Sequence, residues 1–139
     1  MNRSETRKVA FELIYSLEIL KVGKNEYQEQ IDIFLSNRDI NDKNVREYVQ
    51  DVVFGIEEHK DNILEEINKE LSEKWELSRL SKISIAILKL ATYEILYKKL
   101  PYKVVVNEAV ELAKCYGDDN APSFINGILA SIIKNNHIE

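Results

Sequence analysis

Three cationic side chains, Arg3, Arg7 and Lys8, lie close together at the start of the chain. Positive charge at the beginning of a helix opposes the helix dipole and costs a few tenths of a kcal/mol per group. Cations at an unfavourable place indicate a ligand that needs them, and the phosphates of single-stranded RNA are the simplest candidate. A frayed, solvated helix end explains the same residues without a ligand, so both interpretations stay open.

Tyr15 is an aromatic side chain that can extend this cationic surface. It follows Arg7 by eight positions, which is about two helical turns along and only about 80° around the helix axis. The two side chains can therefore share one face, and we assign Tyr15 to RNA binding. Because Ile14 and Leu17 are apolar neighbours, packing in the core is the alternative interpretation of this tyrosine.

The residue types that carry catalysis are sparse and scattered. The two histidines lie far apart, and no Cys, His or Asp cluster has the spacing of metal ligands. A glycine-rich phosphate loop, a nucleophile elbow and the HExxH motif are all missing. Adjacent carboxylates such as Glu57 with Glu58 and Glu65 with Glu66 point to different sides of a helix, and we interpret them as solvent-exposed surface. We therefore expect a protein that is not an enzyme and needs no metal and no cofactor.

The net charge of -5 over 139 residues argues against unspecific binding to nucleic acids. The charge is unevenly distributed, however. Residues 25–73 hold five Lys or Arg against fourteen Asp or Glu, whereas residues 74–103 hold seven against two and residues 1–24 hold five against three. Two basic segments thus flank an acidic one. A local phosphate-binding surface is compatible with this pattern, although charged runs are usually no more than solvated faces.

Cys115 is the single cysteine of the chain, so no internal disulfide can form and a reducing compartment is indicated. We predict that it is a small buried side chain. No apolar run reaches the roughly 18 residues that a membrane span needs, and the N-terminus lacks the pattern of a signal peptide. We therefore expect a cytoplasmic protein that contacts no membrane.

Hydrophobic periodicity predicts an all-α protein of about seven helices without a linker. The first helix is predicted from a cap at Ser4 to a stop at Gly23. Residues 82–97 are apolar on nearly every side, which is typical of a central helix surrounded by others. We interpret the run YKVVV at 102–106 as loop leading into a helix, because a lone strand would have no partner. Further apolar stripes lie at residues 27–35, 45–56, 63–71, 105–113 and 125–133.

Four sequence blocks resemble a known family. They read RKVAFELIY at 7–15, ILKLATYEIL at 87–96, PYKVVVNEAVELAKCYG at 101–117 and SFINGIL at 123–129. In order and spacing they look like the signature blocks of the NusB family of transcription antitermination factors. The combination of NEAVELAK with F-x-NG is highly specific. The resemblance extends from about Arg3 to Ile133, which is nearly the whole chain.

The resemblance implies a helical bundle of two packed three-helix subdomains plus an extra helix, and we expect residues 1–139 to form a single RNA-binding domain. It further implies binding to the boxA element of nascent RNA, together with the small-subunit ribosomal protein that doubles as transcription factor NusE. Within the antitermination complex, this pair helps RNA polymerase to read through terminators on ribosomal RNA operons. Catalysis and cofactors have no part in this role. Whether the free protein is a monomer or a homodimer is left open.

Several site residues follow from the resemblance. The family's N-terminal arginine cluster matches Arg7 and, approximately, Arg3. Its aromatic before the glycine matches Tyr116 and the aromatic of the F-x-NG block matches Phe124, so both rings flank the turn at 117–123 and offer base-stacking surfaces. Packing in the core is the alternative for both. The predicted RNA-binding residues are Arg3, Arg7, Lys8, Tyr15, Tyr116, Asn120 and Phe124.

Some positions depart from the family's pattern. Asn120 stands where an acid is frequent, which removes a repulsion of RNA. Ser84 and Ile85 replace the charged pair usual at the start of the central helix, a place that the family uses for the ribosomal protein. We assign Ser84 and Tyr15 to this partner contact. Gly127 we interpret as structural, since glycine within a helix usually permits close approach of a neighbour.

Two other interpretations stay open at this point. The first is a helical protein-interaction module without a role in RNA binding. The second is a NusB-like accessory domain of an RNA methyltransferase, which would need a further Rossmann-type domain with a cofactor loop, and this sequence carries no such motif.

Overall fold

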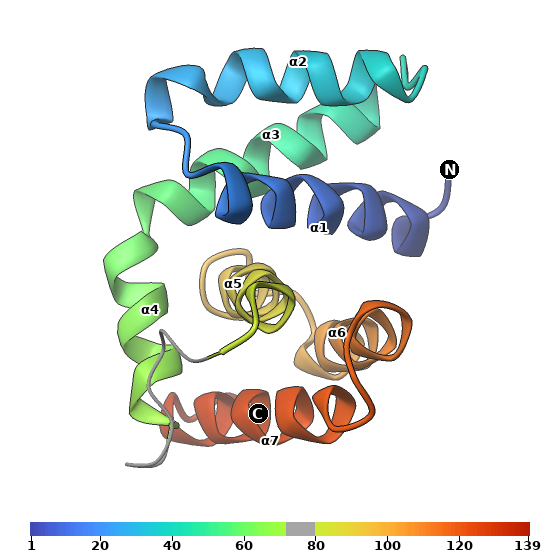
Figure 1. Ribbon diagram of the computed structural model, residues 1–139. Helices are drawn as coiled ribbons and strands as arrows, with labels where there is room; N and C mark the ends of the chain where they lie inside the picture. Colours follow the sequence, from blue (N-terminus) through green and yellow to red (C-terminus); the bar gives the residue numbers. More distant parts are fainter. Residues whose placement is uncertain (72–79) are drawn as a thin grey trace. The chain divides into compact units, whose positions relative to one another are not determined.

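The computed structural model describes residues 1–71 and 80–139, and within these ranges it consists of α-helices and one short 3₁₀ helix, without a strand (Figure 1). The all-α prediction is therefore confirmed. Part of the basic segment 74–103, namely residues 74–79, lies outside the described residues. The elements are α1 (Arg3–Leu20), η1 (Lys24–Glu26), α2 (Tyr27–Asn37), α3 (Lys43–Glu58), α4 (Lys60–Lys69), α5 (Lys82–Leu96), α6 (Tyr102–Tyr116) and α7 (Ala121–Asn135).

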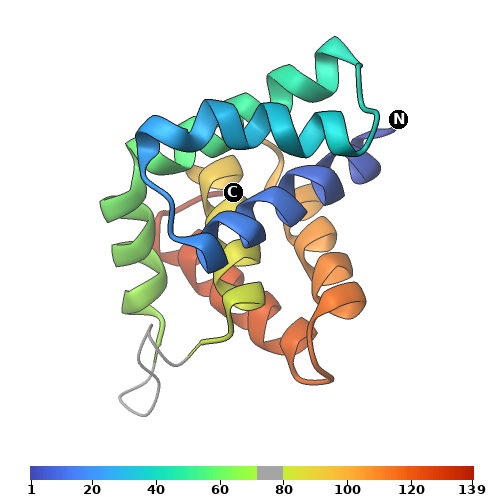
Figure 2. The same cartoon turned by 45° about the horizontal axis from the view of Figure 1, so that its top comes forward.

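The first compact unit, Met1–Glu58, is a three-helix bundle built around α3. This helix packs against α1 and against α2 (Figure 2). The apolar stripes predicted from the sequence meet in its interior. Each large apolar side chain buried there contributes about 1.5–3 kcal/mol to the stability of the fold. The fully buried side chains include Phe11, Leu13, Ile31, Leu35, Val49 and Val52.

Two polar pairs connect the helices of this unit. The Tyr27 hydroxyl donates a hydrogen bond to the Glu57 carboxylate at 3.1 Å. Burial of the hydroxyl raises the pKa of Tyr27 to about 12, and the negative charge of Glu57 acts in the same direction. Arg46 donates to Asp32 at 2.6 Å, and this hydrogen bond holds the pKa of the Asp32 carboxyl below its usual value.

The second compact unit, His59–Glu139, is arranged around α5. This helix packs against α4, α6 and α7, and α6 packs along α7. The prediction of a central helix at 82–97 is therefore confirmed within this unit. Among the described residues this unit holds the four α-helices α4 to α7, whereas the first holds α1, α2 and α3. That the two units act as a single domain over 1–139 stays a prediction. Its fully buried side chains include Ile63, Ile67, Ile87, Leu88, Ile125, Leu129 and Ile132.

Helix boundaries differ from the predicted ones at three places. Asn2, not Ser4, caps α1, because its side chain accepts a hydrogen bond from the backbone of Glu5 at 2.8 Å. The same helix ends before Gly23, since Lys21 adopts the left-handed conformation with φ 54 and its N–H reaches the Leu17 carbonyl. Residues 102–106 were predicted as loop leading into a helix, but the helix α6 already begins at Tyr102, directly after Pro101.

Three predictions about the surroundings of single residues were wrong. Cys115 is exposed, because it lies off the buried stripe of α6 that holds Ala109 and Leu112. Glu66 is buried; it accepts a hydrogen bond from Asn136 at 3.1 Å. Gly127 has no close neighbour that would require a glycine, since a Cβ atom built there meets nothing within 4 Å.

Candidate nucleic-acid interface

The N-terminal cations lie on the first two turns of α1. Arg3 and Lys8 are exposed to solvent. Arg7, in contrast, is buried, with an exposed fraction of 4%. A charged side chain is kept from water only where polar partners compensate for the lost hydration. In this conformation Arg3 and Lys8 are therefore the cations of α1 that a phosphate can reach, and the contact of Arg7 with RNA stays a prediction.

Tyr15 lies on the same face of α1 as Lys8. Seven residues separate the two positions, which brings them to within about 20° around the helix axis. The Tyr15 ring is half-buried and stacks on Phe11, with ring centroids 6.2 Å apart and an angle of 11° between the planes. Tyr15 thus combines packing with partial exposure, which is the arrangement that a surface for base stacking requires.

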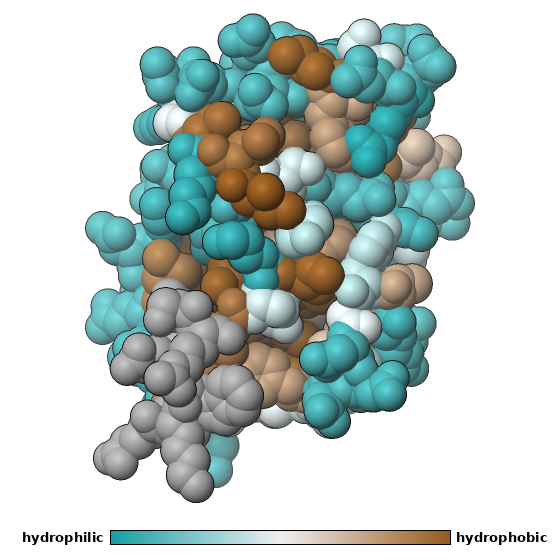
Figure 3. Space-filling model, viewed as in Figure 1, coloured by the Kyte–Doolittle hydropathy of each residue, from teal (hydrophilic) through white to brown (hydrophobic). Residues whose placement is uncertain are grey.

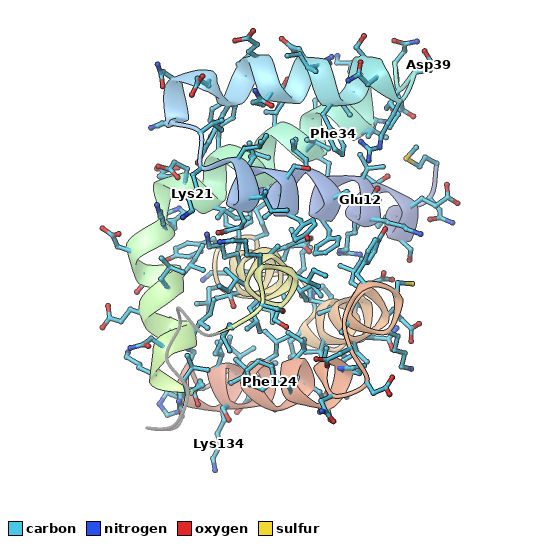
Figure 4. All side chains as sticks on the ribbon, viewed as in Figure 1. Glu12, Lys21, Phe34, Asp39, Phe124 and Lys134 are labelled. Carbon is cyan, nitrogen blue, oxygen red and sulfur yellow. The ribbon has the colours of Figure 1, made fainter. Side chains whose placement is uncertain are left out.

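Arg38 adds a cation beside this face that the sequence analysis missed. Its guanidinium lies 3.7 Å from the centroid of the Phe34 ring and 3.8 Å from the Glu12 carboxylate. Glu12 lies between Lys8 and Tyr15 in the sequence of α1. Figure 4 labels Glu12 on α1 and Phe34 on α2. The signal available in the sequence was the spacing of Phe34 and Arg38, because side chains four residues apart meet along a helix.

The turn between α6 and α7 is held by a glycine and an aspartate. A Cβ atom on Gly117 would lie 2.6 Å from the Cβ of Ala121 and 3.0 Å from the carbonyl oxygen of Ala113, so only glycine fits. The Asp118 carboxylate accepts hydrogen bonds from the N–H groups of Asn120 and Ala121, each at 3.0 Å. The predicted turn is therefore present but shorter than 117–123, since α7 begins at Ala121, and the Asp118 carboxylate holds it together.

Three predicted RNA-binding residues lie around this turn. Tyr116 is the last residue of α6, Asn120 directly precedes α7, and Phe124 lies in the first turn of α7. Both rings are half-buried, and Asn120 is exposed. Figure 4 labels Phe124 on α7. The turn thus presents an exposed carboxamide between two partly exposed rings, a combination that suits an unstacked base.

Ser84 offers little surface to a partner. It is 7% exposed on α5, and its N–H donates to the side chain of Ser81, which caps the helix, at 3.1 Å. Its assignment to the ribosomal protein therefore stays a prediction.

The structure brings the predicted RNA-binding residues together in two groups. Arg3, Arg7, Lys8 and Tyr15 lie on α1 of the first unit, and Tyr116, Asn120 and Phe124 lie at the α6–α7 turn of the second. A surface that joins the two groups stays a prediction.

Two further observations concern the described part of the chain. No three His, Cys, Asp or Glu side chains come together there as metal ligands. None of its helices combines the length and the apolar character that crossing a membrane requires.

Apolar side chains do reach the surface of the first unit, among them Ile19, Leu20 and Ile33, and Figure 3 shows such residues over α1 and α2.

Comparison with known proteins gives matches over nearly the whole chain. A model described as the NusB family matches residues 4–134. The transcription antitermination protein NusB of Clostridium novyi is 45% identical over 136 residues, covering 96% of this chain and 99% of that protein. T. maritima NusB has a TM-score of 0.81 at 34% identity and covers 96% of this chain and 92% of its own. A crystal structure of antitermination factors NusB and NusE in complex with dsRNA has a TM-score of 0.83 at 27% identity. The match covers 97% of this chain and 99% of that chain.

Proposed function

Because the chain belongs to the NusB family of transcription antitermination proteins, we propose that it binds boxA-type single-stranded RNA together with a NusE-type ribosomal protein. In this role it is part of the antitermination complex with which RNA polymerase reads through terminators on ribosomal RNA operons. The observation that carries the proposal is the match, over nearly the full chain, to a NusB solved with NusE and RNA.

The local chemistry supports RNA as the ligand. Arg3 and Lys8 are exposed cations that can contact phosphates, and each contact releases counterions from the RNA. The half-buried rings of Tyr116 and Phe124 supply stacking surfaces that accept any base. Because cations and aromatic rings are both needed for single strands, we assign phosphate contacts to α1 and base contacts to the α6–α7 turn.

We also propose that the protein acts by binding and not by catalysis, in the cytoplasm, where transcription takes place. The curated relatives are named as antitermination proteins and not as enzymes. The two compact units would then serve as one RNA-binding domain over residues 1–139. Tyr15 and Ser84 remain the residues that we assign to the contact with the NusE-type partner.

A titration of labelled RNA tests the proposal. A boxA-type RNA and a shuffled RNA of the same composition are each titrated with the protein, with and without the NusE-type ribosomal protein, and anisotropy is followed. We expect weak binding of boxA RNA by the protein alone, tighter binding with the partner, and weaker binding of the shuffled RNA. Binding of the ribosomal protein without any effect on RNA affinity would instead support the protein-interaction module.

A further inference from the structure

The connection between α5 and α6 carries an unusual density of cations and aromatic rings for an acidic protein. Residues 97–103 read YKKLPYK. Lys99 and Lys103 are exposed, and neither forms an ion pair within the part of the chain that the structure describes. Lys99 adopts the left-handed conformation, with φ 52, where the chain turns before Pro101. Two exposed lysines thus lie at and just before the start of α6.

These lysines lie in a hollow surface of the second unit. A depression of about 630 Å³ is lined by Lys99, Tyr102 and Lys103 together with residues of the C-terminal segment, including Glu139. A second depression of about 430 Å³ lies between α6 and α7 and shares Tyr102 and Lys103 with the first. The two depressions are therefore neighbours, and we describe them together as one groove.

The second depression adds two carboxamides to the cations, among the aliphatic side chains of Val106, Val110, Ala130 and Ile133. Asn107 of α6 and Asn126 of α7 line it, and both are exposed. A carboxamide both donates and accepts hydrogen bonds, as the edges of nucleobases do. Lys99 thus lines the first depression, Asn107 and Asn126 line the second, and Tyr102 and Lys103 line both. We call this surface the Lys99–Asn126 groove.

We propose that the Lys99–Asn126 groove binds a second stretch of single-stranded RNA, with phosphates at Lys99 and Lys103 and a base against Tyr102. An acidic protein segment would use the lysines but would have little use for the ring and the carboxamides, which is why RNA fits better. The Glu139 carboxylate opposes an anion in the first depression, so the two lysines must outweigh it. The inference rests on the proposed RNA-binding function and adds a contact to it.

The lysines of the groove lie far from the α6–α7 turn, whereas Asn126 at its other end is two residues from Phe124 on α7. Lys103 is the second residue of α6 and Tyr116 the last, so the helix holds them about 20 Å apart at 1.5 Å per residue. A stacked strand advances by about 3.4 Å per nucleotide, so roughly six nucleotides are needed to span this distance. An RNA of about five nucleotides is therefore too short to reach from the turn to Lys103, whereas one of about sixteen can reach both the turn and the lysines.

Charge-neutral variants test the inference. Lys99→Gln with Lys103→Gln removes both cations and keeps most of each side chain. The matched control, Lys82→Gln with Lys134→Gln, removes the same charge from exposed lysines that line neither depression; Figure 4 shows Lys134 pointing away from α7. Thermal melting followed by circular dichroism checks that both variants fold. Affinity for the short and the long RNA is then measured at several salt concentrations.

We expect the groove variant to lose affinity for the long RNA by about 10-fold or more at 0.1 M salt. Its salt slope should fall by about 1.4, which corresponds to two phosphate contacts on a single strand. The short RNA should bind as tightly as it does to the unmodified protein, and the control should keep its salt slope for both RNAs.

Three results would overturn the inference, and they are distinguishable from failure of the proposed function. Unchanged affinity of the groove variant for the long RNA, or an equal loss in the control, leaves RNA binding intact but removes the groove from it. Loss of binding to the ribosomal protein, with RNA affinity kept, would assign the groove to a protein. If the unmodified protein bound neither RNA, with or without the partner, the proposed function would fail and the inference with it.

Discussion

At the scale of the single residue, two arginines of one helix differ in burial and therefore in their expected contribution to stability. Arg3 is exposed, whereas Arg7 is 4% exposed, although the two are one helical turn apart on α1. Arg7→Ala removes a buried side chain and leaves its polar surroundings unsatisfied, so we expect a loss of about 1–3 kcal/mol in stability. Arg3→Ala should change stability by no more than about 0.5 kcal/mol.

Urea denaturation and RNA titration of both arginine variants give the comparison. If Arg3 contacts phosphate, its variant binds RNA more weakly at unchanged stability. Equal and small stability losses for the two variants would show that Arg7 is not held in the interior as the structure has it.

Tyr116 and Phe124 test whether the α6–α7 turn is a binding site. Stacking on an aromatic side chain is worth about 1–3 kcal/mol per base by alanine substitution, so each alanine variant should bind boxA RNA roughly 5- to 150-fold more weakly. Since both rings are half-buried, some loss of melting temperature is expected as well. A large fall in melting temperature, with unchanged affinity per folded molecule, would identify the rings as core residues.

The Tyr27–Glu57 pair predicts how stability depends on alkaline pH. The folded protein raises the pKa of Tyr27 from 10.0 to about 12, so folding favours the protonated phenol. The contribution of the protonated Tyr27 to the free energy of unfolding is complete below pH 10 and is lost as the pH rises from 10 towards 12. Tyr27→Phe removes the group that titrates. Its unfolding free energy should therefore fall less steeply than that of the unmodified protein between pH 9 and about 11, and parallel curves would contradict the assignment.

At the scale of the element, two glycines of the second unit make opposite predictions. Gly117→Ala forces a Cβ atom to within 2.6 Å of Ala121, so α6 and α7 must shift and we expect a loss of about 1–3 kcal/mol. Gly127→Ala meets nothing within 4 Å in the middle of α7 and should gain about 0.5–1 kcal/mol, because alanine favours the helix. Chemical denaturation of both variants checks the sign, and destabilisation by Gly127→Ala would reveal a neighbour that the structure lacks.

The helices themselves were predictable because their apolar stripes are long and periodic. Val45 to Ile56 and Ile125 to Ile133, for example, are buried on one side along the whole helix. Helix ends were less predictable, since they depend on single caps. Lys21 ends α1 in a conformation usually taken by glycine, two residues before Gly23, because the Leu17 carbonyl is satisfied there.

The candidate site could be predicted only in part. The turn at 117–120 follows from its residue types, because Asp, Asn and Gly satisfy backbone groups locally. The burial of Arg7 could not be read from the sequence, since arginine is usually exposed and its position beside Lys8 indicates a cationic surface. Arg38 was missed although its spacing from Phe34 fits a contact along α2, and its ion-pair partner Glu12 comes from another helix, α1.

At the scale of the whole molecule, a net charge of -5 limits how RNA can be held. An acidic protein gains little from its overall field, so its affinity for RNA must come from local cations. The exposed lysines and arginines that we assign to RNA are Arg3, Lys8, Lys99 and Lys103. Their number sets the salt dependence of binding, because each phosphate contact on a single strand contributes about 0.7 to the slope of log affinity against log salt.

The salt slope therefore counts the sites that an RNA occupies. With Arg3 and Lys8 alone, the slope is about -1.4 and affinity falls about 7-fold between 50 and 200 mM salt. With Lys99 and Lys103 added, the slope is about -2.8 and the fall is about 50-fold. A short boxA RNA should give the first value and a long one the second, measured by anisotropy in a monovalent salt series. Affinity that does not change with salt would exclude phosphate contacts altogether, and a slope beyond about -5 would require more cations than these two surfaces provide.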